Sequence, residues 1–471
     1  ALASIPASPL CTHKPNVSSK QVHLQQFNRN SPLILIIFLT FVSQSPHLRG
    51  QNHVIPIQVH QSIMKAKQIL PALGLSLLLT APALVAQPTT QTQKCCSQCS
   101  QCTHKTGLSQ LPRTIFSGVR GPFHVQGIAV DLKRGYIYFS FTTELLKTDL
   151  KGRVLGSVEG INGHLGCLAL NPDDGRLYAS LECKDDAIGR TIARGTGINV
   201  AKANAGSLFY VAVFEPERIT RIGMDARKDS VMYPVYVAEA TADYTASVEI
   251  HGRQQMHRYG CSGIDGLAFA PAPGKRYLDG EQHLLYVAYG IYGDTTRTDN
   301  DHQVLLCYDT RKWNRYAAQT DWNNLQRRGP RKPLHKYFVY TGNTNYGVQN
   351  LAYDASTGYL LMAVYKGRKN MFPNYTLFAV DCRKPSSTGV LKGVEPEERA
   401  MLLPLADAGM RDEVTGIRGW HFQWGSTGLC PLGNGLFYVS HNAKKADGTE
   451  TCTARLYRWT GNAESPFEPV R

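Results

Sequence analysis

Histidine, acidic and aromatic side chains recur at five places in the chain, each time beside one short apolar pattern. The pattern is HVQGIAVD from His124, HLGCLALN from His164, GIDGLAFA from Gly263, GVQNLAYD from Gly347 and GSTGLCPL from Gly425. Imidazoles and carboxylates can hold a cation or form an acid–base pair, and aromatic rings can stack on a planar ligand. Such chemistry requires the five copies to meet in space.

Each copy is typical of a strand buried on both faces, and a turn and a second strand follow it. DLKRG precedes YIYFSF, and NPDDG precedes RLYASLE, where Gly, Asp and Asn suit tight turns. Third and fourth strands can be placed in four of the units, including AMLLPLA (residues 400–406) as the fourth strand of the fourth unit.

Four-stranded units repeated in this way predict an all-β fold, a single β-propeller of five four-stranded blades. The strand RTIFSGV, residues 113–119, precedes the first unit and is expected to close the ring within the last blade. The units are longer than compact blades, so six or seven blades are the alternatives. A β-sandwich would not be expected to repeat its inner strand five times.

In a propeller the innermost strands line a central channel, and the loops that enter them share one face with the loops between second and third strands. The positions that match at the channel are Gln126, Gly166, Asp265, Gln349 and Thr427. Any one histidine or tryptophan here could simply satisfy backbone groups or cover a blade end, but the convergence of the whole set predicts a ligand site. The candidate ligand-binding residues are His124, His164, Gln126, Tyr346, Gln349, Trp420, His421, Trp424 and His441.

The expected ligand is a carbohydrate, a peptide or a small organic molecule, and the sequence favours a binding protein over an enzyme. A metal-assisted hydrolase at the same channel mouth is the alternative, with Asp265 and Glu182 as ligands of a divalent cation such as calcium. If zinc bound instead, His164 or His441 would replace some of the oxygens. The chain has no Gly-x-Ser-x-Gly elbow and no phosphate-binding loop.

The segment IDGLAFAPAPGKRYLDGEQHLLYVAYG, residues 264–290, resembles the strand–turn–strand unit of gluconolactonase-like propellers, and QGIAVD with GYIYFSF resembles the NHL-type repeat. The resemblance covers the inner hairpins of about five units. It implies a propeller, and it places Asp265 where the gluconolactonase-like enzymes have a calcium-binding Asn. The chain has no match to that family's first-blade metal-binding Glu or to its catalytic Asp.

A short apolar run, residues 69–79, follows two lysines and is itself followed by small residues up to Ala86. This pattern predicts a signal peptide over residues 64–86, with residues 1–63 as an upstream extension. We therefore expect a secreted or periplasmic protein with no transmembrane domain in the mature chain. A membrane hairpin made from this run and residues 34–42 is the alternative.

The remaining segments are a Cys-rich linker, residues 87–110, and the propeller, residues 111–471. The linker contains the cluster Cys95, Cys96, Cys99 and Cys102. In an exported tail, disulfides or an intermolecular tether are expected more than a metal site, but the pairing is open.

The chain is 42% hydrophobic and 18% charged, which suits a packed core, and its formal net charge is +15. One stretch, Arg311–Lys336, contains eight Lys and Arg and a single acid. Because it would connect the third and fourth strands of its blade, we expect it on the face opposite the ligand site. An anionic polysaccharide or membrane surface is a candidate partner, nucleic acid is not expected, and a solvated loop is the alternative.

Overall fold

The computed structural model describes residues 110–471, except for 196–205 and 276–281. The predicted extension and signal peptide, and all but the last residue of the linker, therefore lie outside the described residues. In the described part, five sheets form five blades of one β-propeller. Their innermost strands are β2 (Gly127–Asp131), β6 (His164–Leu170), β13 (Cys261–Ala270), β17 (Asn345–Asp354) and β24 (Leu429–Gly433).

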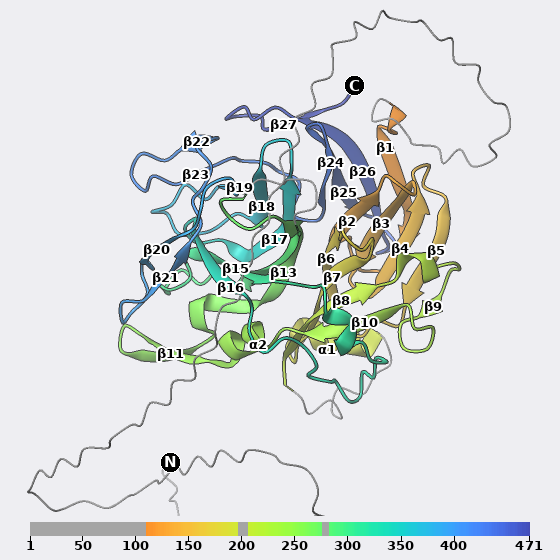
Figure 1. The fold of residues 1–471 in the computed structure, drawn as a ribbon, viewed down its shortest axis with the longest axis horizontal. Helices are drawn as coiled ribbons and strands as arrows, with labels where there is room; N and C mark the ends of the chain where they lie inside the picture. The colour runs from red at the N-terminus through yellow and green to blue at the C-terminus, as the bar shows by residue number, and fades with distance from the viewer. Residues whose placement is uncertain (1–109, 196–205, 276–281) are drawn as a thin grey trace, which may run out of the picture. The chain divides into compact units, whose positions relative to one another are not determined.

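These five strands contact one another in the cyclic order β2, β6, β13, β17, β24 and back to β2, which confirms the five-bladed ring (Figure 1). Antiparallel strands continue each blade outward. They are β3 (Tyr136–Phe141), β4 (Glu144–Asp149) and β5 (Val154–Glu159) in blade 1; β7 (Leu177–Cys183), β8 (Leu208–Phe214) and β10 (Met232–Tyr236) in blade 2; β14 (Leu284–Ile291), β15 (His302–Tyr308) and β16 (His335–Tyr340) in blade 3; β18 (Tyr359–Tyr365) and β19 (Leu377–Asp381) in blade 4; and β25 (Leu436–Lys444) and β26 (Glu450–Trp459) in blade 5.

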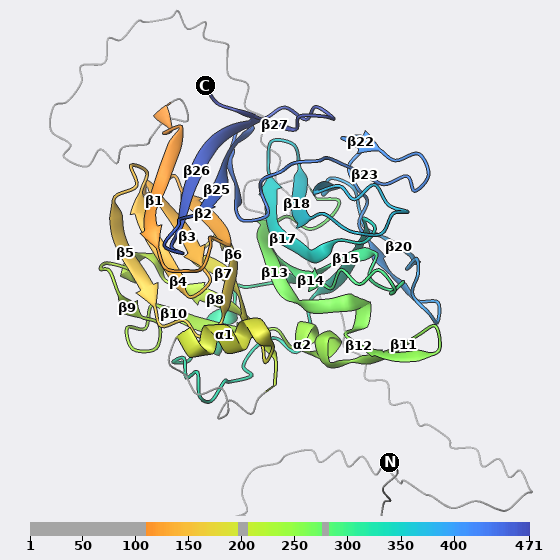
Figure 2. The same cartoon turned by 180° about the vertical axis from the view of Figure 1, so that it is seen from behind.

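The ring is closed as predicted by the N-terminal strand β1 (Thr114–Arg120), which pairs antiparallel with β26. Thr114 lies opposite Arg455, and the Ser117 hydroxyl accepts a hydrogen bond of 3.0 Å from the backbone N–H of Cys452. Both ribbon views show β1 beside β26 (Figures 1 and 2). The short strand β27 (Phe467–Pro469) pairs with the rest of the same edge of β26.

Blade 4 differs from the prediction in part, because only the second half of AMLLPLA lies in the place of its fourth strand. Residues Arg399–Leu402 form β21, which pairs in parallel with β16 of blade 3 and antiparallel with β20 (Ser387–Val390). The second half runs along β19: Leu405 bridges Val380, the Pro404 carbonyl accepts a 3.2 Å hydrogen bond from the Asp381 N–H, and the Ala406 N–H donates to the Ala379 carbonyl at 2.7 Å. The apolar pattern predicted a strand correctly, but it could not say which of two neighbouring sheets would take it.

A segment of one blade covers the blade before it at three places. In each, the loop that precedes the fourth strand of a blade covers the outer edge of the preceding blade. We call these three segments the edge loops. In blade 2 the loop carries β9 (Met224–Asp225), which pairs in parallel with β5 of blade 1. In blade 3 the Arg328 carbonyl accepts a 2.8 Å hydrogen bond from the Tyr236 N–H at the edge of β10. The third edge loop is the β20–β21 pair.

The basic stretch Arg311–Lys336 is thus the second edge loop. It begins on the predicted opposite face, where the Asn314 side chain accepts a hydrogen bond from Arg176, the residue before β7, but it does not stay there. It lies along blade 2 and reaches the end where the inner strands begin, because the Trp322 indole N–H donates to the carbonyl of Gly160, at 2.7 Å. Trp322 and Trp313 are buried.

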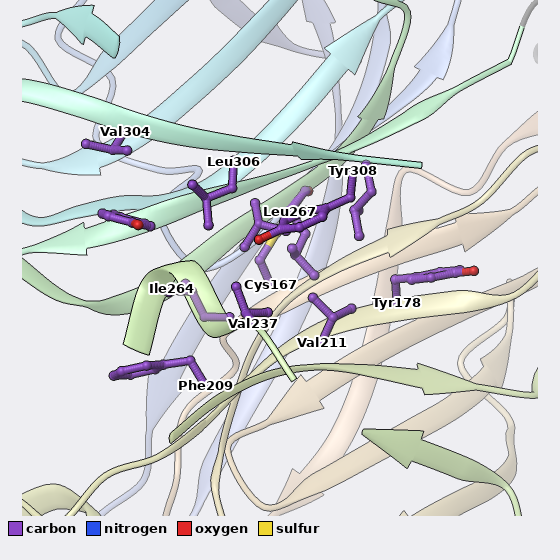
Figure 3. Packing of buried hydrophobic residues seen from close by; sticks show 14 of the residues in the cluster. Cys167, Tyr178, Phe209, Val211, Val237, Ile264, Leu267, Val304, Leu306 and Tyr308 are labelled. Carbon is purple, nitrogen blue, oxygen red and sulfur yellow. The ribbon is translucent and has the colours of Figure 1, made fainter. Parts of the chain in front are cut away.

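The core lies between adjacent blades, and β8 shows how one strand serves two interfaces. Phe209 and Val211 pack toward blade 3 with Ile264 and Leu306 (Figure 3). The alternate residues, such as Tyr210, pack toward blade 1. Because successive side chains of a strand point to opposite faces, a fully apolar strand is the signature of this double burial.

The remaining described elements are short. They are the α-helices α1 (Ala187–Gly195) and α2 (Ala238–Thr245), the hairpins β11 (Ser247–Ile250) with β12 (Arg253–Met256) and β22 (Met410–Arg411) with β23 (Arg418–Gly419), and the 3-10 helices η3 (Pro216–Arg218), η4 (Arg258–Gly260) and η5 (Trp313–Tyr316). Among the described residues, no helix is long and apolar enough to cross a membrane.

Candidate functional site

Irregular pairing marks the beginning of the inner strands, which we call the upper mouth of the channel. The register between the first and second strands shifts after Leu165 in β6, after Ile264 in β13 and after Val348 in β17. Three of the matched channel positions, Gly166, Asp265 and Gln349, lie at these shifts. A bulge re-aims a side chain and is common beside active sites, so the same irregularity in three blades turns polar residues toward the axis.

Asp265 is the acidic residue of this mouth. A Cβ atom added at Gly166 would collide with its carboxylate, so the glycine in β6 provides the space for the acidic side chain. The Gln349 side chain and the Cys167 N–H hydrogen-bond the carboxylate. Burial, reinforced by the charge of Glu182, nevertheless raises the pKa of Asp265 well above its usual range. The residue is therefore suited to hold a proton.

Beside it, Glu182 forms an ion pair with Lys184, whose Nζ lies 2.9 Å from Oε2. The Glu182 carboxylate also accepts a hydrogen bond of 2.9 Å from the N–H of Ile264. His164 pairs with Glu182 across the β6–β7 ladder, but its Nδ1 is 3.8 Å from Oε2 and has no hydrogen-bond partner. Burial, with Lys184 nearby, lowers the pKa of His164 to about 3, so the ring is neutral.

The predicted cation ligands Asp265 and Glu182 do lie near each other, since the Glu182 carboxylate accepts its hydrogen bond from the N–H of Ile264, the residue before Asp265. The Lys184 ammonium, however, already neutralises Glu182. Among the described residues, no group of three or more His, Cys, Asp or Glu is gathered as a metal site would need. A calcium ion would therefore have to displace Lys184, and the metal hypothesis stays a prediction that elemental analysis of purified protein tests.

One layer below, the channel is closed by a polar plug. Asn350 Nδ2 donates to the carbonyls of Gln126 and Ser426, at 2.9 Å each, and its Oδ1 lies 3.4 Å from the Cys167 thiol. A Cβ at Gly127 would lie 2.8 Å from the backbone of Cys167, so the strands approach too closely there for any side chain. The plug separates the upper mouth from the lower mouth.

The lower mouth is an apolar cavity of about 370 Å³, lined by all five inner strands. Its walls include Ile128–Val130, Leu168–Leu170, Leu267–Phe269, Leu351–Tyr353 and Leu429–Pro431. Here β6, β13 and β17 pair regularly, whereas the register of β24 shifts between Pro431 and Gly433. The carboxylate at the end of β17, Asp354, accepts hydrogen bonds from the hydroxyls of Ser356 and Thr357.

A second cavity, of about 350 Å³, lies at the upper mouth between blades 4, 5 and 1, and we call it the rim cavity. Two predicted residues, His124 and Trp424, line it. The Trp424 ring stacks on His441 with centroids 3.9 Å apart, and His441 Nε2 lies 3.0 Å from the Tyr457 hydroxyl. The full lining is His124, Tyr365, Gln423, Trp424, Ser426, Thr427, Asn442, Ala443, Lys444 and Glu450.

Glu450 is the functional candidate that the sequence analysis missed. It begins β26 and is 6% exposed, yet its Oε2 has no hydrogen-bond partner. It is close enough to His124 for its charge to act on that ring, although burial dominates and lowers the pKa of His124. The one sequence signal was the turn ADGT, which places an acidic residue at the start of a strand beside the channel.

Unfavourable backbone conformations also gather at the upper mouth. Tyr346, which precedes the bulge in β17, has a φ of 65° and is 52% exposed. Its ring meets that of Tyr365 edge-on, at 6.3 Å. Thr142, which accepts a 3.4 Å hydrogen bond from the Gln126 amide, has a φ of 46°. A non-glycine residue in this region is uncommon, and such residues cluster at functional sites.

Of the nine predicted ligand-binding residues, seven do not line the rim cavity, and Trp420 and His421 are two of these. Trp420 is 1% exposed, and its indole N–H donates to the Asn462 carbonyl at 3.0 Å within the core of blades 4 and 5. His421 is exposed and packs against Tyr375, with ring centroids 5.1 Å apart. The run GWHFQWG therefore contributes only Gln423 and Trp424 to this cavity.

No family model matches the chain, and no curated protein matches it. It is similar to solved structures at 11–12% identity. The chain described as Kuenenia stuttgartiensis hydrazine synthase has a TM-score of 0.26, with 73% of this chain and 67% of that one covered. The PQQ domain of pyranose dehydrogenase from Coprinopsis cinerea has a TM-score of 0.28, with 70% of this chain and 81% of that one covered. The Dos1 propeller has a TM-score of 0.24, with 74% of this chain and 82% of that one covered. Likenesses at this level carry no argument, and the propeller assignment rests on the strand pairing. The resemblance to gluconolactonase-like and NHL-type proteins stays a prediction.

Proposed function

We propose that this protein is a ligand-binding propeller whose site is the rim cavity. The observation that supports it best is the combination, in one cavity, of the Trp424 ring with the buried and unpartnered carboxylate oxygen of Glu450. Buried polar groups are normally hydrogen-bonded, and an unpaired one that lines a cavity marks a place for a ligand atom.

The cavity has the size of the smaller pockets that bind organic ligands, so it suits one sugar ring, one amino-acid side chain or a comparable molecule. Trp424 and Tyr365 supply flat apolar surface, while His124 and Asn442 supply hydrogen-bonding groups at its edge. Binding needs no reaction step.

Export to the periplasm or the outside of the cell is part of this proposal, on the strength of the signal-peptide pattern in residues 64–86. The exposed Arg328, Arg331 and Lys332 of the second edge loop could face an anionic surface. Since the two tryptophans of that stretch are buried, such an interaction would be electrostatic, without aromatic stacking.

The test is ligand-observed NMR on the full chain with a panel of monosaccharides, dipeptides and small amines, repeated on Trp424→Ala. Loss of the ring should weaken any bound member of the panel about ten-fold or more. Phe116→Ala is the matched control, because it removes an exposed aromatic ring that does not line the cavity. Binding that survives in Trp424→Ala would show that the rim cavity is not the site.

A further inference from the structure

Nine carboxylates are buried in the described part of the chain, and they differ in how their charge is compensated. Six of them have a cationic partner. The pairs are Asp131–Arg134, Glu182–Lys184, Asp243–Lys336, Asp299–Arg297, Asp301–Lys369 and Asp381–Arg383. Asp354 is held by serine and threonine hydroxyls, and burial raises the pKa of Asp265 so that it retains its proton more strongly. Glu450 is the ninth.

The Glu450 side chain forms neither a hydrogen bond nor an ion pair with any described residue, although two cationic residues lie beside it in the sheet. Lys444 is directly opposite in β25, but it is exposed. Arg120 is directly opposite in β1, but its guanidinium binds Glu144, with Nε 3.2 Å from the carboxylate. A buried carboxylate without compensation is costly, so the site is incomplete as it stands.

Aromatic rings lie in the same cavity as this carboxylate. Trp424 and Tyr365 both line it, and the ring of Trp424 is backed by His441. An ammonium group is attracted both by a carboxylate and by the face of an aromatic ring, and the two attractions reinforce each other when water is excluded. A neutral sugar would satisfy the hydrogen-bonding capacity of Glu450 but would leave its charge uncompensated.

We propose that the ligand of the rim cavity carries a protonated alkylamine, which pairs with Glu450 and lies against Trp424 and Tyr365. The inference rests on the proposed function and narrows its ligand class. Lys444 lines the same cavity and repels a cationic ligand, so its exposed side chain sets an upper limit on affinity. The amine can belong to a small free molecule or to a lysine side chain of a peptide.

The experiment is calorimetric titration of the full chain with butylammonium and with 1-butanol, its neutral counterpart. Butylammonium should bind at least about ten-fold more tightly, as expected for a charged hydrogen bond to a buried group. Glu450→Gln should remove this difference, while Glu464→Gln, an exposed carboxylate with the same change of charge, should preserve it. Lys444→Met should strengthen butylammonium binding. Titration with 1,5-diaminopentane and with the blocked peptide Gly-Lys-Gly distinguishes the two sources of the amine.

Glu450→Gln also provides a readout that does not depend on ligand. Because the substitution removes an uncompensated buried charge and keeps the shape, it should raise the melting temperature, whereas a purely structural glutamate would lower it when replaced. Equal affinity for butylammonium and 1-butanol, or undiminished amine binding by Glu450→Gln, would overturn the inference. If neutral members of the NMR panel then bound to the parent protein but more weakly to Trp424→Ala, the proposed function would hold and only the inference of an amine ligand would fail. If amines bound without regard to either residue, both proposals would fall.

Discussion

The two mouths of the central channel are lined by the same five strands, but they have opposite character. At the upper mouth three strands bulge, Asp265 and Glu182 are buried together, and Tyr346 has a left-handed backbone. At the lower mouth the same three strands pair regularly, the walls are mostly apolar, and the one carboxylate of β17, Asp354, accepts several hydrogen bonds. The plug at Asn350 separates them.

This difference shows where the fold tolerates unfavourable arrangements. A polar cluster that is only partly compensated reduces stability, and a regular apolar mouth contributes to it. In many proteins such local cost coincides with a functional site. Four predictions, given in order of decreasing magnitude, test whether the upper mouth is the one that reduces stability.

Asn350→Leu should lower the free energy of unfolding by about 3 kcal/mol, because two buried backbone carbonyls would lose their donor. Urea denaturation measures the effect. The control is Asn323→Leu, at an exposed position, which should change stability by less than about 0.5 kcal/mol. Stability like that of the parent protein would mean that the plug does not hold the two mouths apart.

Asp265→Asn and Asp354→Asn should change the free energy of unfolding in opposite directions. Because the folded-state pKa of Asp265 is raised, the folded protein holds that proton more tightly, and stability falls as the pH rises toward the raised pKa. Asp265→Asn should therefore raise the free energy of unfolding by about 2 kcal/mol near pH 7 and abolish this pH dependence. Asp354→Asn should lower the free energy of unfolding by about 1–2 kcal/mol, because it weakens the hydrogen bonds from the hydroxyls of Ser356 and Thr357. Denaturation from about pH 4 to about pH 8 compares them; the same sign in both variants would refute the contrast.

His164 should destabilise the protein in acid. Its folded-state pKa of about 3 lies below the unfolded value of 6.5, so stability is lost as the pH falls below 6.5. Since the side chain is 18% exposed, we expect a loss of about 1–2 kcal/mol near pH 4.5, and a smaller loss in His164→Asn. NMR titration of the imidazole is the direct measurement. A ring that titrates near 6.5 would contradict the burial argument.

Tyr346→Gly should change stability least, with a gain of no more than about 1 kcal/mol from relief of its left-handed backbone. Tyr353→Gly, in the same strand at the lower mouth, removes a ring that packs in the core and should destabilise. Thermal unfolding of the two variants decides whether strain in β17 is confined to its upper end.

Much of the fold could be predicted from the sequence, because period and turn residues act locally. The inner strands, the five blades and the closure by β1 were all predicted, since each is encoded in a short apolar run with a turn beside it. Which sheet takes a strand is decided by contacts between distant segments. For that reason the whole of AMLLPLA was assigned to blade 4, although its first half joins blade 3. Likewise the whole of Arg311–Lys336 was expected on the face opposite the ligand site, although only its first part lies there.

The candidate site could be predicted only in part. Matching the five copies located the channel positions, and it brought together Asp265 with Gln349 and His124 with Trp424. It could not distinguish Trp424 from Trp420, because four residues along an irregular loop separate a cavity wall from a buried contact. Glu450 was missed because it is distinguished only by having no hydrogen-bond or ion-pair partner. That property depends on the directions of the Lys444 and Arg120 side chains, which the sequence does not give.

The three edge loops have a consequence for how the chain folds as it is synthesised. Blade 1 emerges first, but its outer edge is covered by β9, which belongs to blade 2, and blades 2 and 3 likewise wait for segments of the blades that follow. The N-terminal strand waits longest, because Ser117 meets a partner 335 residues later in the chain. A growing chain on the ribosome thus always carries at least one unpaired strand edge, a hazard for aggregation until the last blade is complete. A truncated transcript or a stalled ribosome would release an open ring. A chaperone that binds unfolded chains is therefore the kind of factor that the folding of this protein would need.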